Sequence, residues 1–125
     1  MTGSVLIARP VWPVLKSLAE GLVSRGYFVE RSGSWDALLD PRPAGEGLAA
    51  AFLGEYGEAD AEEEILRRFR KEDGGKGVPV FLVGGKNALR RERRFREAGA
   101  DRVFSAELAA ADILDRSGPL RIPAD

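Results

Sequence analysis

The residues best placed to do chemistry follow the apolar runs of the chain, and they differ in charge and in residue type. Arg9 and Pro10 come directly after the run VLIA, Gly54 and Glu55 follow LAAAFL, and Gly84 follows VFLV. An apolar run of this kind predicts a strand buried on both faces. Parallel strands bring their carboxyl ends to one edge of a sheet, where α/β proteins bind ligands. We therefore expect these side chains to gather at one crevice.

This set lacks the groups that most catalytic sites require. The chain has no cysteine and no histidine, which excludes thiol nucleophiles, histidine general bases, disulfides and the usual zinc ligands. Phosphoryl transfer needs an oxygen nucleophile and cations, and a Mg²⁺ site needs carboxylate oxygens at a fixed crevice. One carboxylate beside one guanidinium does not make a metal site. We expect no enzymatic activity, no cofactor and no bound metal.

Composition indicates a single globular domain. The chain has 125 residues, of which 44% are hydrophobic and 31% charged, and its net charge is −1. No overall field would therefore draw it to nucleic acid or to an anionic membrane. Residues 1–10 lack the basic start and the apolar core of a signal peptide, and no apolar run approaches the length of a membrane span. We expect a cytoplasmic protein.

Strand-like and helix-like segments alternate along the chain. Strands are expected at 4–8, 27–30, 48–53, 78–83 and 101–105. Helices are expected at 12–26, 58–72, 86–100 and 106–118, with a short helix within 32–40. This alternation predicts a five-stranded parallel sheet with helices on both faces, an α/β three-layer sandwich of the flavodoxin-like kind. Residues 1–118 would form the domain, and residues 119–125 a C-terminal tail or the start of a linker.

The stretch RRERRFRE is the most unusual in the chain. Leu89 and Phe95 are expected to be its main buried anchors, because the rest of the helix at 87–98 is polar. The arginines left on its exposed surface are Arg90, Arg91, Arg93 and Arg94.

Three interpretations of this arginine-rich helix stay open. Arginine is enriched at interface hot spots, so the helix is a candidate partner-binding surface. A solvated face held by ion pairs one helical turn apart, Glu92 with Arg96 and Arg93 with Glu97, is the structural alternative. A nucleic-acid surface is the third, although interleaved aromatic residues and recognised binding motifs are missing.

Two further motifs have structural explanations as well as functional ones. LVGGKN could place backbone N–H groups around an anion, which keeps open a small nucleotide- or anion-binding domain of flavodoxin-like fold. It lacks the spacing of a Walker A loop, and a tight turn before a helix explains it equally. The acids of ADAEEE match the dipole of a helix N-terminus, so we expect a solvated face there rather than a metal cluster.

Several segments, taken in order, resemble the receiver domain of bacterial response regulators. They are VLIA, RGYFVE, GVPVFLVGG and FREAGADRVFS, and together they span almost the whole chain. The passage REAGAD before the last strand is the most specific. The resemblance implies the CheY-like, (βα)5 form of the fold and a role in two-component signal transduction.

The positions that carry receiver chemistry are changed here. The resemblance implies an acidic pair after the first strand, where this chain has Arg9 and Pro10. The phosphate-accepting aspartate corresponds to Gly54, with Glu55 beside it. The Thr or Ser that ends the fourth strand corresponds to Gly84. The Lys after the fifth strand corresponds to Ala106.

The resemblance therefore implies a pseudo-receiver, a non-catalytic regulatory module that acts by protein–protein interaction independently of aspartyl phosphorylation. Receivers use the corresponding helix 87–98, strand 101–105 and last helix as their output face, so a protein partner is expected there, and a homodimer through the same face stays open. Nucleic acid and membrane partners are not expected. We also expect Arg9 to replace the missing cation and to pair with Glu55, the alternative being that both are solvated strand-end residues.

Overall fold

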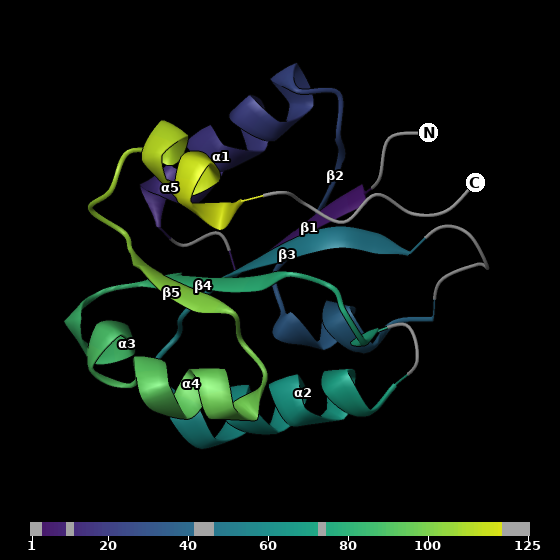
Figure 1. Ribbon diagram of the computed structural model, residues 1–125, viewed down its shortest axis with the longest axis vertical. Helices are drawn as coiled ribbons and strands as arrows, with labels where there is room; N and C mark the ends of the chain where they lie inside the picture. The colour runs from purple at the N-terminus through teal and green to yellow at the C-terminus, as the bar shows by residue number, and fades with distance from the viewer. Residues whose placement is uncertain (1–3, 10–11, 42–46, 73–74, 119–125) are drawn as a thin grey trace.

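The sheet is parallel throughout and has five strands in the order β2-β1-β3-β4-β5. The computed structural model describes residues 4–9, 12–41, 47–72 and 75–118 (Figure 1). The strands are β1 (Ser4–Ala8), β2 (Phe28–Ser32), β3 (Leu48–Gly54), β4 (Val80–Gly84) and β5 (Arg102–Ser105). This order is that of a doubly wound sheet, and it confirms the predicted CheY-like fold.

Helices cover both faces of the sheet and complete the three layers. They are α1 (Pro13–Ser24), η1 (Trp35–Leu39, a 3₁₀ helix), α2 (Ala59–Lys71), α3 (Lys86–Arg90), α4 (Glu92–Ala98) and α5 (Ala110–Ser117). In Figure 1, α1 and α5 lie above the sheet, and η1, α2, α3 and α4 lie below it. Among the described residues, no helix has the length and apolar character that crossing a membrane requires.

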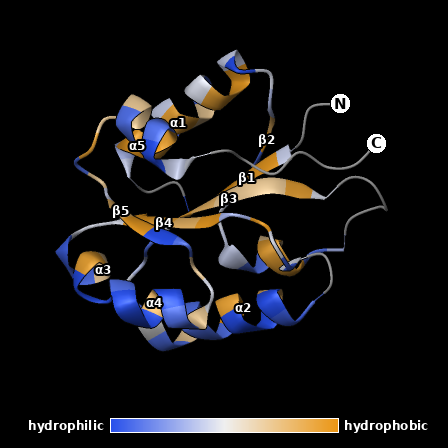
Figure 2. Ribbon diagram, viewed as in Figure 1, coloured by the Kyte–Doolittle hydropathy of each residue, from blue (hydrophilic) through white to orange (hydrophobic). Residues whose placement is uncertain are grey.

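The apolar residues form one core on each side of the sheet. Leu15, Leu18 and Leu22 of α1 pack on one face with Ile113 of α5. On the other face, the core contains Trp35 and residues of α2 and α4. All seven residues of β3 are buried, as expected for the central strand of a sheet covered on both sides. Figure 2 shows this as apolar colour on the strands and polar colour on the outer surfaces of α2 and α4.

The predicted helix at 86–100 is two helices, because the chain breaks at Arg91 (φ −102°, ψ 11°). This break changes which residues face the core. Phe95 is buried as predicted, but the prediction for Leu89 is wrong, since its side chain is 39% exposed and Ala88 is buried in its place. The second helix ends at Ala98, where Gly99 takes a φ of +134° that suits glycine.

Other boundaries differ from the sequence prediction by a few residues. β2 extends to Ser32, and β4 begins at Val80 rather than at residue 78. The last helix begins at Ala110 rather than at residue 106. A turn precedes it, in which the Ser105 hydroxyl and carbonyl accept hydrogen bonds from the main-chain N–H groups of Glu107 and Leu108. Residues 119–125, predicted as a tail, lie outside the described residues.

A partly buried arginine, Arg70, holds the end of α2 against the segments that precede β4 and β5. The Arg70 guanidinium donates hydrogen bonds to the carbonyl oxygens of Gly99 (2.9 Å), Gly75 (2.7 Å) and Val78 (2.7 Å), and it pairs with Asp101 at 3.1 Å. These contacts join the end of α2 to the segment that follows it and to residues 99–101, which are distant in the sequence. They fix the orientation of α2, whose first turn reaches the crevice described next.

Candidate crevice at the carboxyl edge of the sheet

The structure gathers the predicted strand-end residues at one edge. Main-chain hydrogen bonds align the ends: Glu55 N–H donates to Val83, and Ala106 N–H donates to Gly84, at 3.0 and 2.9 Å. Arg9 follows β1, which lies between β2 and β3. Arg9, Gly54, Glu55, Gly84 and Ala106 are thus brought together as their spacing predicts. Pro10, the sixth predicted position, lies outside the described residues.

The space beside Gly54 is filled by the main chain. A Cβ atom placed on Gly54 would meet the carbonyl oxygen of Arg9 far inside van der Waals contact, and the Arg9 carbonyl carbon at 3.0 Å. Arg9 has a φ of +54°, the left-handed region that non-glycine residues rarely adopt, and this conformation directs its carbonyl toward β3. The carbonyl oxygen of Gly54 in turn accepts a 2.8 Å hydrogen bond from Trp35 Nε1. This backbone has no room for any side chain at position 54.

The space beside Gly84 is filled in a similar way. A Cβ atom on Gly84 would lie 2.7 Å from the Cβ of Ala88 and 2.8 Å from the Cβ of Glu55. Carbon atoms without a bond between them do not approach that closely, so the start of α3 and the loop after β3 close over this strand end. Two neighbouring strand ends therefore carry glycine for steric reasons.

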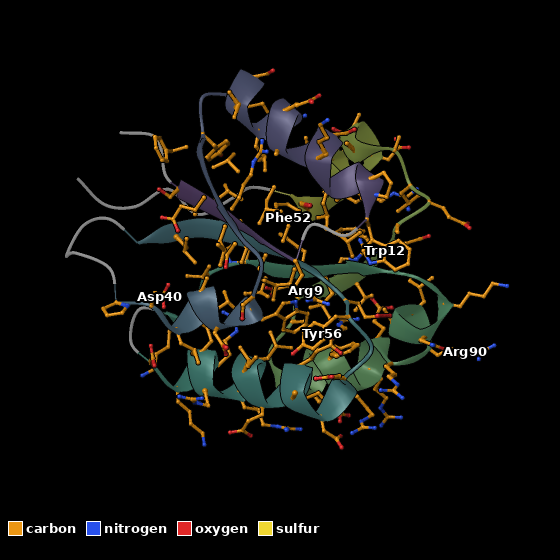
Figure 3. The ribbon with its side chains drawn as sticks, turned by 180° about the vertical axis from the view of Figure 1, so that it is seen from behind. Arg9, Trp12, Asp40, Phe52, Tyr56 and Arg90 are labelled. Atoms are coloured by element: carbon orange, nitrogen blue, oxygen red, sulfur yellow. The ribbon has the colours of Figure 1, made fainter. Side chains whose placement is uncertain are left out.

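The Arg9 guanidinium lies over the ring of Tyr56, with 4.8 Å between its central carbon and the ring centroid (Figure 3). Tyr56 packs edge-on against Trp35, with ring centroids 5.5 Å apart and an interplanar angle of 89°. Arg9 Nε is buried and has no hydrogen-bond partner in the part of the chain that the structure describes. The expected ion pair with Glu55 is not formed within the described part of the chain, because the guanidinium is held on the aromatic face instead.

A buried carboxylate that the sequence reading missed lies next to this crevice. Glu62, in the first turns of α2, is 0% exposed. Its Oε2 accepts a 3.1 Å hydrogen bond from the main-chain N–H of Tyr56, whereas Oε1 is buried without a partner among the described residues. Burial raises the pKa of Glu62 to about 6, with Glu55 adding to the rise and Arg91 opposing it. The carboxyl group thus changes charge near pH 6, above the range of an ordinary glutamate.

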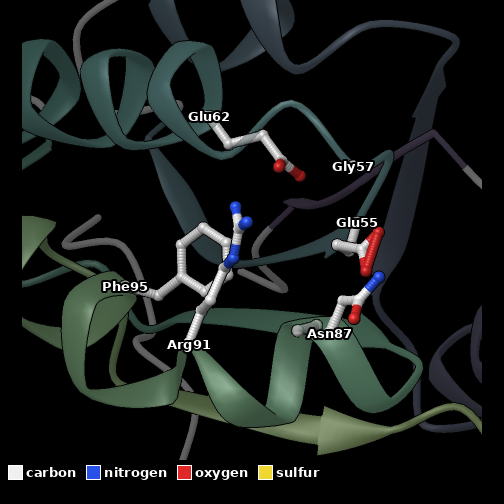
Figure 4. A pocket seen from close by; sticks show the side chains of 7 residues that line it. Glu55, Gly57, Glu62, Asn87, Arg91 and Phe95 are labelled. Carbon is white, nitrogen blue, oxygen red and sulfur yellow. The ribbon is translucent and has the colours of Figure 1, made fainter.

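Glu62 faces a cavity of about 30 Å³, which has room for one or two water molecules. Figure 4 shows Arg91 reaching from the α3–α4 junction toward Glu62, alongside Phe95. The residues that line the cavity are Glu55, Gly57, Glu62, Asn87, Ala88, Arg91 and Phe95. In the part of the chain that the structure describes, no group of three or more His, Cys, Asp and Glu side chains could hold a metal ion.

The acids of ADAEEE are not all solvated, contrary to the prediction. Glu62 and Glu63 are buried, 0% and 2% exposed, because they lie on the side of α2 that packs on the molecule. The signal was present in the sequence, since position 62 is on the same helical stripe as Leu66 and Phe69. Opposite charge compensates Glu63: Arg67 and Arg94 approach its carboxylate at 3.1 and 3.0 Å.

The four predicted surface arginines are exposed, but they do not form a single patch. Arg94 reaches back to α2, where its Nη2 lies 3.4 Å from Asp60 in addition to its contact with Glu63. Arg91 lines the cavity, and Arg93 pairs with Glu97 at 3.3 Å as predicted. Arg90 extends from the outer side of α3 into solvent (Figure 3).

The predicted pairing of Glu92 with Arg96 is replaced by another contact. Glu92 Oε2 accepts a 3.1 Å hydrogen bond from the main-chain N–H of Val103, which ties α4 to β5. Arg96 is exposed on the same helix.

Solved structures of similar fold are numerous, whereas no protein-family model and no curated protein matches the chain. A CheY-like receiver domain protein from Methanospirillum hungatei superposes with a TM-score of 0.72 at 21% identity, covering 93% of this chain and 90% of that one. The non-phosphorylated receiver domain of HemR from Leptospira biflexa gives 0.71 at 17% identity, covering 99% and 100%. The receiver domain of a sensor histidine kinase from Pseudomonas aeruginosa, solved with magnesium in its active-site cleft, gives 0.68 at 20% identity, covering 94% and 95%. At these identities the likeness establishes the fold.

Proposed function

We propose that this chain is a degenerate receiver domain, a pseudo-receiver, which works as a non-catalytic regulatory module in the cytoplasm by protein–protein contact. The observation that carries the proposal is the closed position 54, where the Arg9 carbonyl takes the space that a phosphate-accepting side chain would need. Signalling by this domain is then independent of aspartyl phosphate.

The charges at the crevice support the same conclusion. Receiver chemistry requires a carboxylate nucleophile and a Mg²⁺ ion held by further carboxylates. Here a guanidinium stands after β1, and Glu55 is the carboxylate next to the closed position. A cation on the protein opposes the binding of a second cation at the same edge.

The surface that we propose for partner binding is formed by α4, β5 and α5, together with Arg90 of the preceding helix. β5 is an edge strand with α4 beside it (Figure 1). Arg91 and Arg94 have contacts inside the molecule, so the arginines most available to a partner are Arg90 and Arg93. Guanidinium groups in such positions favour a partner with acidic side chains.

The first experiment is a titration with beryllofluoride and Mg²⁺, followed by amide NMR shifts. Beryllofluoride mimics an acyl phosphate, so a working pocket would show localised shifts around residues 9, 54 and 84. We expect no such shifts in a sample whose dispersed spectrum shows that it is folded. Mg²⁺ with fluoride alone serves as the control, and localised shifts that require beryllium would overturn the proposal.

The partner surface is tested by photo-crosslinking in extracts of the native cell. A photoreactive residue at position 93 is compared with one at position 16, an exposed site on α1 across the sheet. We expect a defined protein adduct from position 93 and none from position 16. Equal labelling from both positions would contradict the surface. An adduct with nucleic acid whose yield falls steeply with salt would favour that alternative instead.

A further inference from the structure

Glu62 is a buried carboxylate, only partly hydrogen-bonded, that lies between the closed crevice and the arginine-rich helices α3 and α4. Glu62 has one carboxylate oxygen that accepts a hydrogen bond from Tyr56 N–H and one, Oε1, that has no partner among the described residues. A buried ionised group that lacks a partner is costly, so such a group responds strongly to any change in its surroundings. The cavity of about 30 Å³ beside it has room for water but not for a larger ligand.

The charges that surround Glu62 come from three elements. The loop after β3 supplies Glu55 and Tyr56, the N-cap of α2 supplies Glu58, and the α3–α4 junction supplies Arg91. Asn87 of α3 adds an uncharged polar group. The described residues form no group of three or more His, Cys, Asp and Glu side chains that could hold a metal ion here, so a proton is the cation that this excess negative charge can bind.

Other charged groups lie on the flanks of the same site. Arg9 lies over the Tyr56 ring, and Asp36 approaches Tyr56 from η1. On the outer side, Arg94 joins α4 to Asp60 and Glu63 of α2. These contacts hold the interface between α2 and α4 together independently of Glu62.

Arg91 lies at the junction between two helices. It is the residue at which α3 ends and α4 begins, and its carbonyl accepts the first hydrogen bond of α4 from Phe95 N–H at 3.0 Å. Arg90 and Arg93 flank it on the exposed surface. A change in the position of the Arg91 side chain therefore affects the α3–α4 junction, and with it the orientation of Arg90 and Arg93.

We propose that Glu62 is a proton-operated switch that acts through Arg91 on the α3–α4 junction and so on the surface carrying Arg90 and Arg93. This inference rests on the proposed function, because it supplies a regulation of the partner surface that needs no phosphate. When Glu62 is ionised, its attraction holds the Arg91 guanidinium in the cavity. When Glu62 is protonated, that attraction is lost, and the Arg91 side chain, which is already exposed on its outer side, moves away from the cavity.

The direction of the pH effect follows from burial. Burial raises the pKa of Glu62 to about 6, so the side chain is mostly ionised at pH 7 and mostly protonated at pH 5. Removing the guanidinium of Arg91 would raise this pKa further, whereas removing the negative charge of Glu55 would lower it.

The test is an NMR titration between pH 7.5 and 4 that follows the Glu62 side-chain carboxyl carbon and the amides of residues 86–98. We expect the carboxyl carbon and the amides around Arg91 to move with a common midpoint near 6. In R91Q the Glu62 midpoint should rise, and in E55Q it should fall. In E62Q the amide transition should disappear. R93Q, on the exposed side of the same helix, is the matched control and should leave the midpoint unchanged.

Two results would overturn the inference. One is a Glu62 midpoint at the ordinary value for glutamate, and the other is a raised midpoint that leaves the amides of residues 86–98 unmoved. The titration uses the wild-type chain, so it does not depend on whether E62Q folds. Beryllofluoride binding would refute the proposed function without changing this titration, so the two failures are distinguishable.

Discussion

The carbonyl oxygen of Arg9 occupies the space that a side chain on Gly54 would fill. Two strands meet at this point, since β1 and β3 are neighbours in the sheet. The contact depends on the left-handed backbone of Arg9, which aims the carbonyl across the strand ends. The crevice is therefore closed by main chain, and a single substitution that places an acid at position 54 cannot open it.

Substituting Gly54 should destabilise the fold strongly. In G54A the new methyl group would collide with the Arg9 carbonyl, a main-chain atom that cannot move alone, so we expect a loss of about 3 kcal/mol or more in the free energy of unfolding. G33A is the control, because a Cβ at that exposed position meets no atom within 4 Å. Urea unfolding measures both variants, and equal stabilities would contradict the closed position.

Arg9 and Tyr56 should be energetically coupled. The guanidinium lies 4.8 Å from the ring centroid in a half-buried setting, for which a cation–π contact contributes roughly 1 kcal/mol. A double-mutant cycle with R9A and Y56L, measured by urea unfolding, should give a coupling energy of that size. A coupling near zero would show that Arg9 contributes no more than a solvated residue.

The backbone of Arg9 gives a separate expectation. Because its φ is +54°, R9G should be more stable than R9A by about 1 kcal/mol, even though glycine is the more flexible residue in the unfolded chain. The two variants lack the same guanidinium, so their difference isolates the backbone conformation. If R9A is the more stable of the two, the left-handed conformation is not present in solution.

The free energy of unfolding should depend on pH through Glu62. Its folded pKa, about 6, lies above the ordinary value of 4.5, so the folded protein binds a proton more tightly than the unfolded chain. The stability contributed by this proton is fully present below pH 4.5 and is lost as the pH rises through 6. The difference is on the order of 2 kcal/mol. E62Q should remove this dependence and be more stable than wild type at pH 7, and urea unfolding at pH 5 and 7 measures both effects.

Arg70 should be much more important for stability than the exposed arginines. R70M would leave the carbonyl groups of Gly99, Gly75 and Val78 without their donor, so we expect a loss of about 3 kcal/mol in the free energy of unfolding. R93M is the control, because Arg93 is 91% exposed and its ion pair should contribute less than about 1 kcal/mol. Thermal or urea unfolding should separate the two variants clearly.

The fold was predictable because each part of its signal is local. The runs SVLIA, LAAAFL and VPVFLV are short and apolar, which is typical of buried strands, and the segments between them have helical spacing with glycine at their ends. Position in the chain also identified the strand-end residues, including Gly54 and Gly84, because parallel strands must end at a common edge. The absence of the expected acids could then be read directly from the residues.

The sequence could not show what fills the crevice. The position of the Arg9 carbonyl depends on the φ of Arg9 and on the pairing of β1 with β3, and both arise only when the sheet is assembled. Arg9 was expected to meet Glu55, but Tyr56 packs on Trp35 in a way that offers its ring to the guanidinium. Likewise, the interruption at Arg91 has no local marker such as proline or glycine. Because of it, Ala88 is buried in the core and Leu89 is exposed.

By itself, the sequence determined the class of fold, the edge at which the strand ends meet and the residue types found at those ends, because periodicity and residue type act over short distances. Only the tertiary structure decided that main chain closes position 54 and that Glu62 is buried beside Arg91. Those relationships join residues that are distant along the chain. They follow from close packing, because a space that one group fills is not open to another.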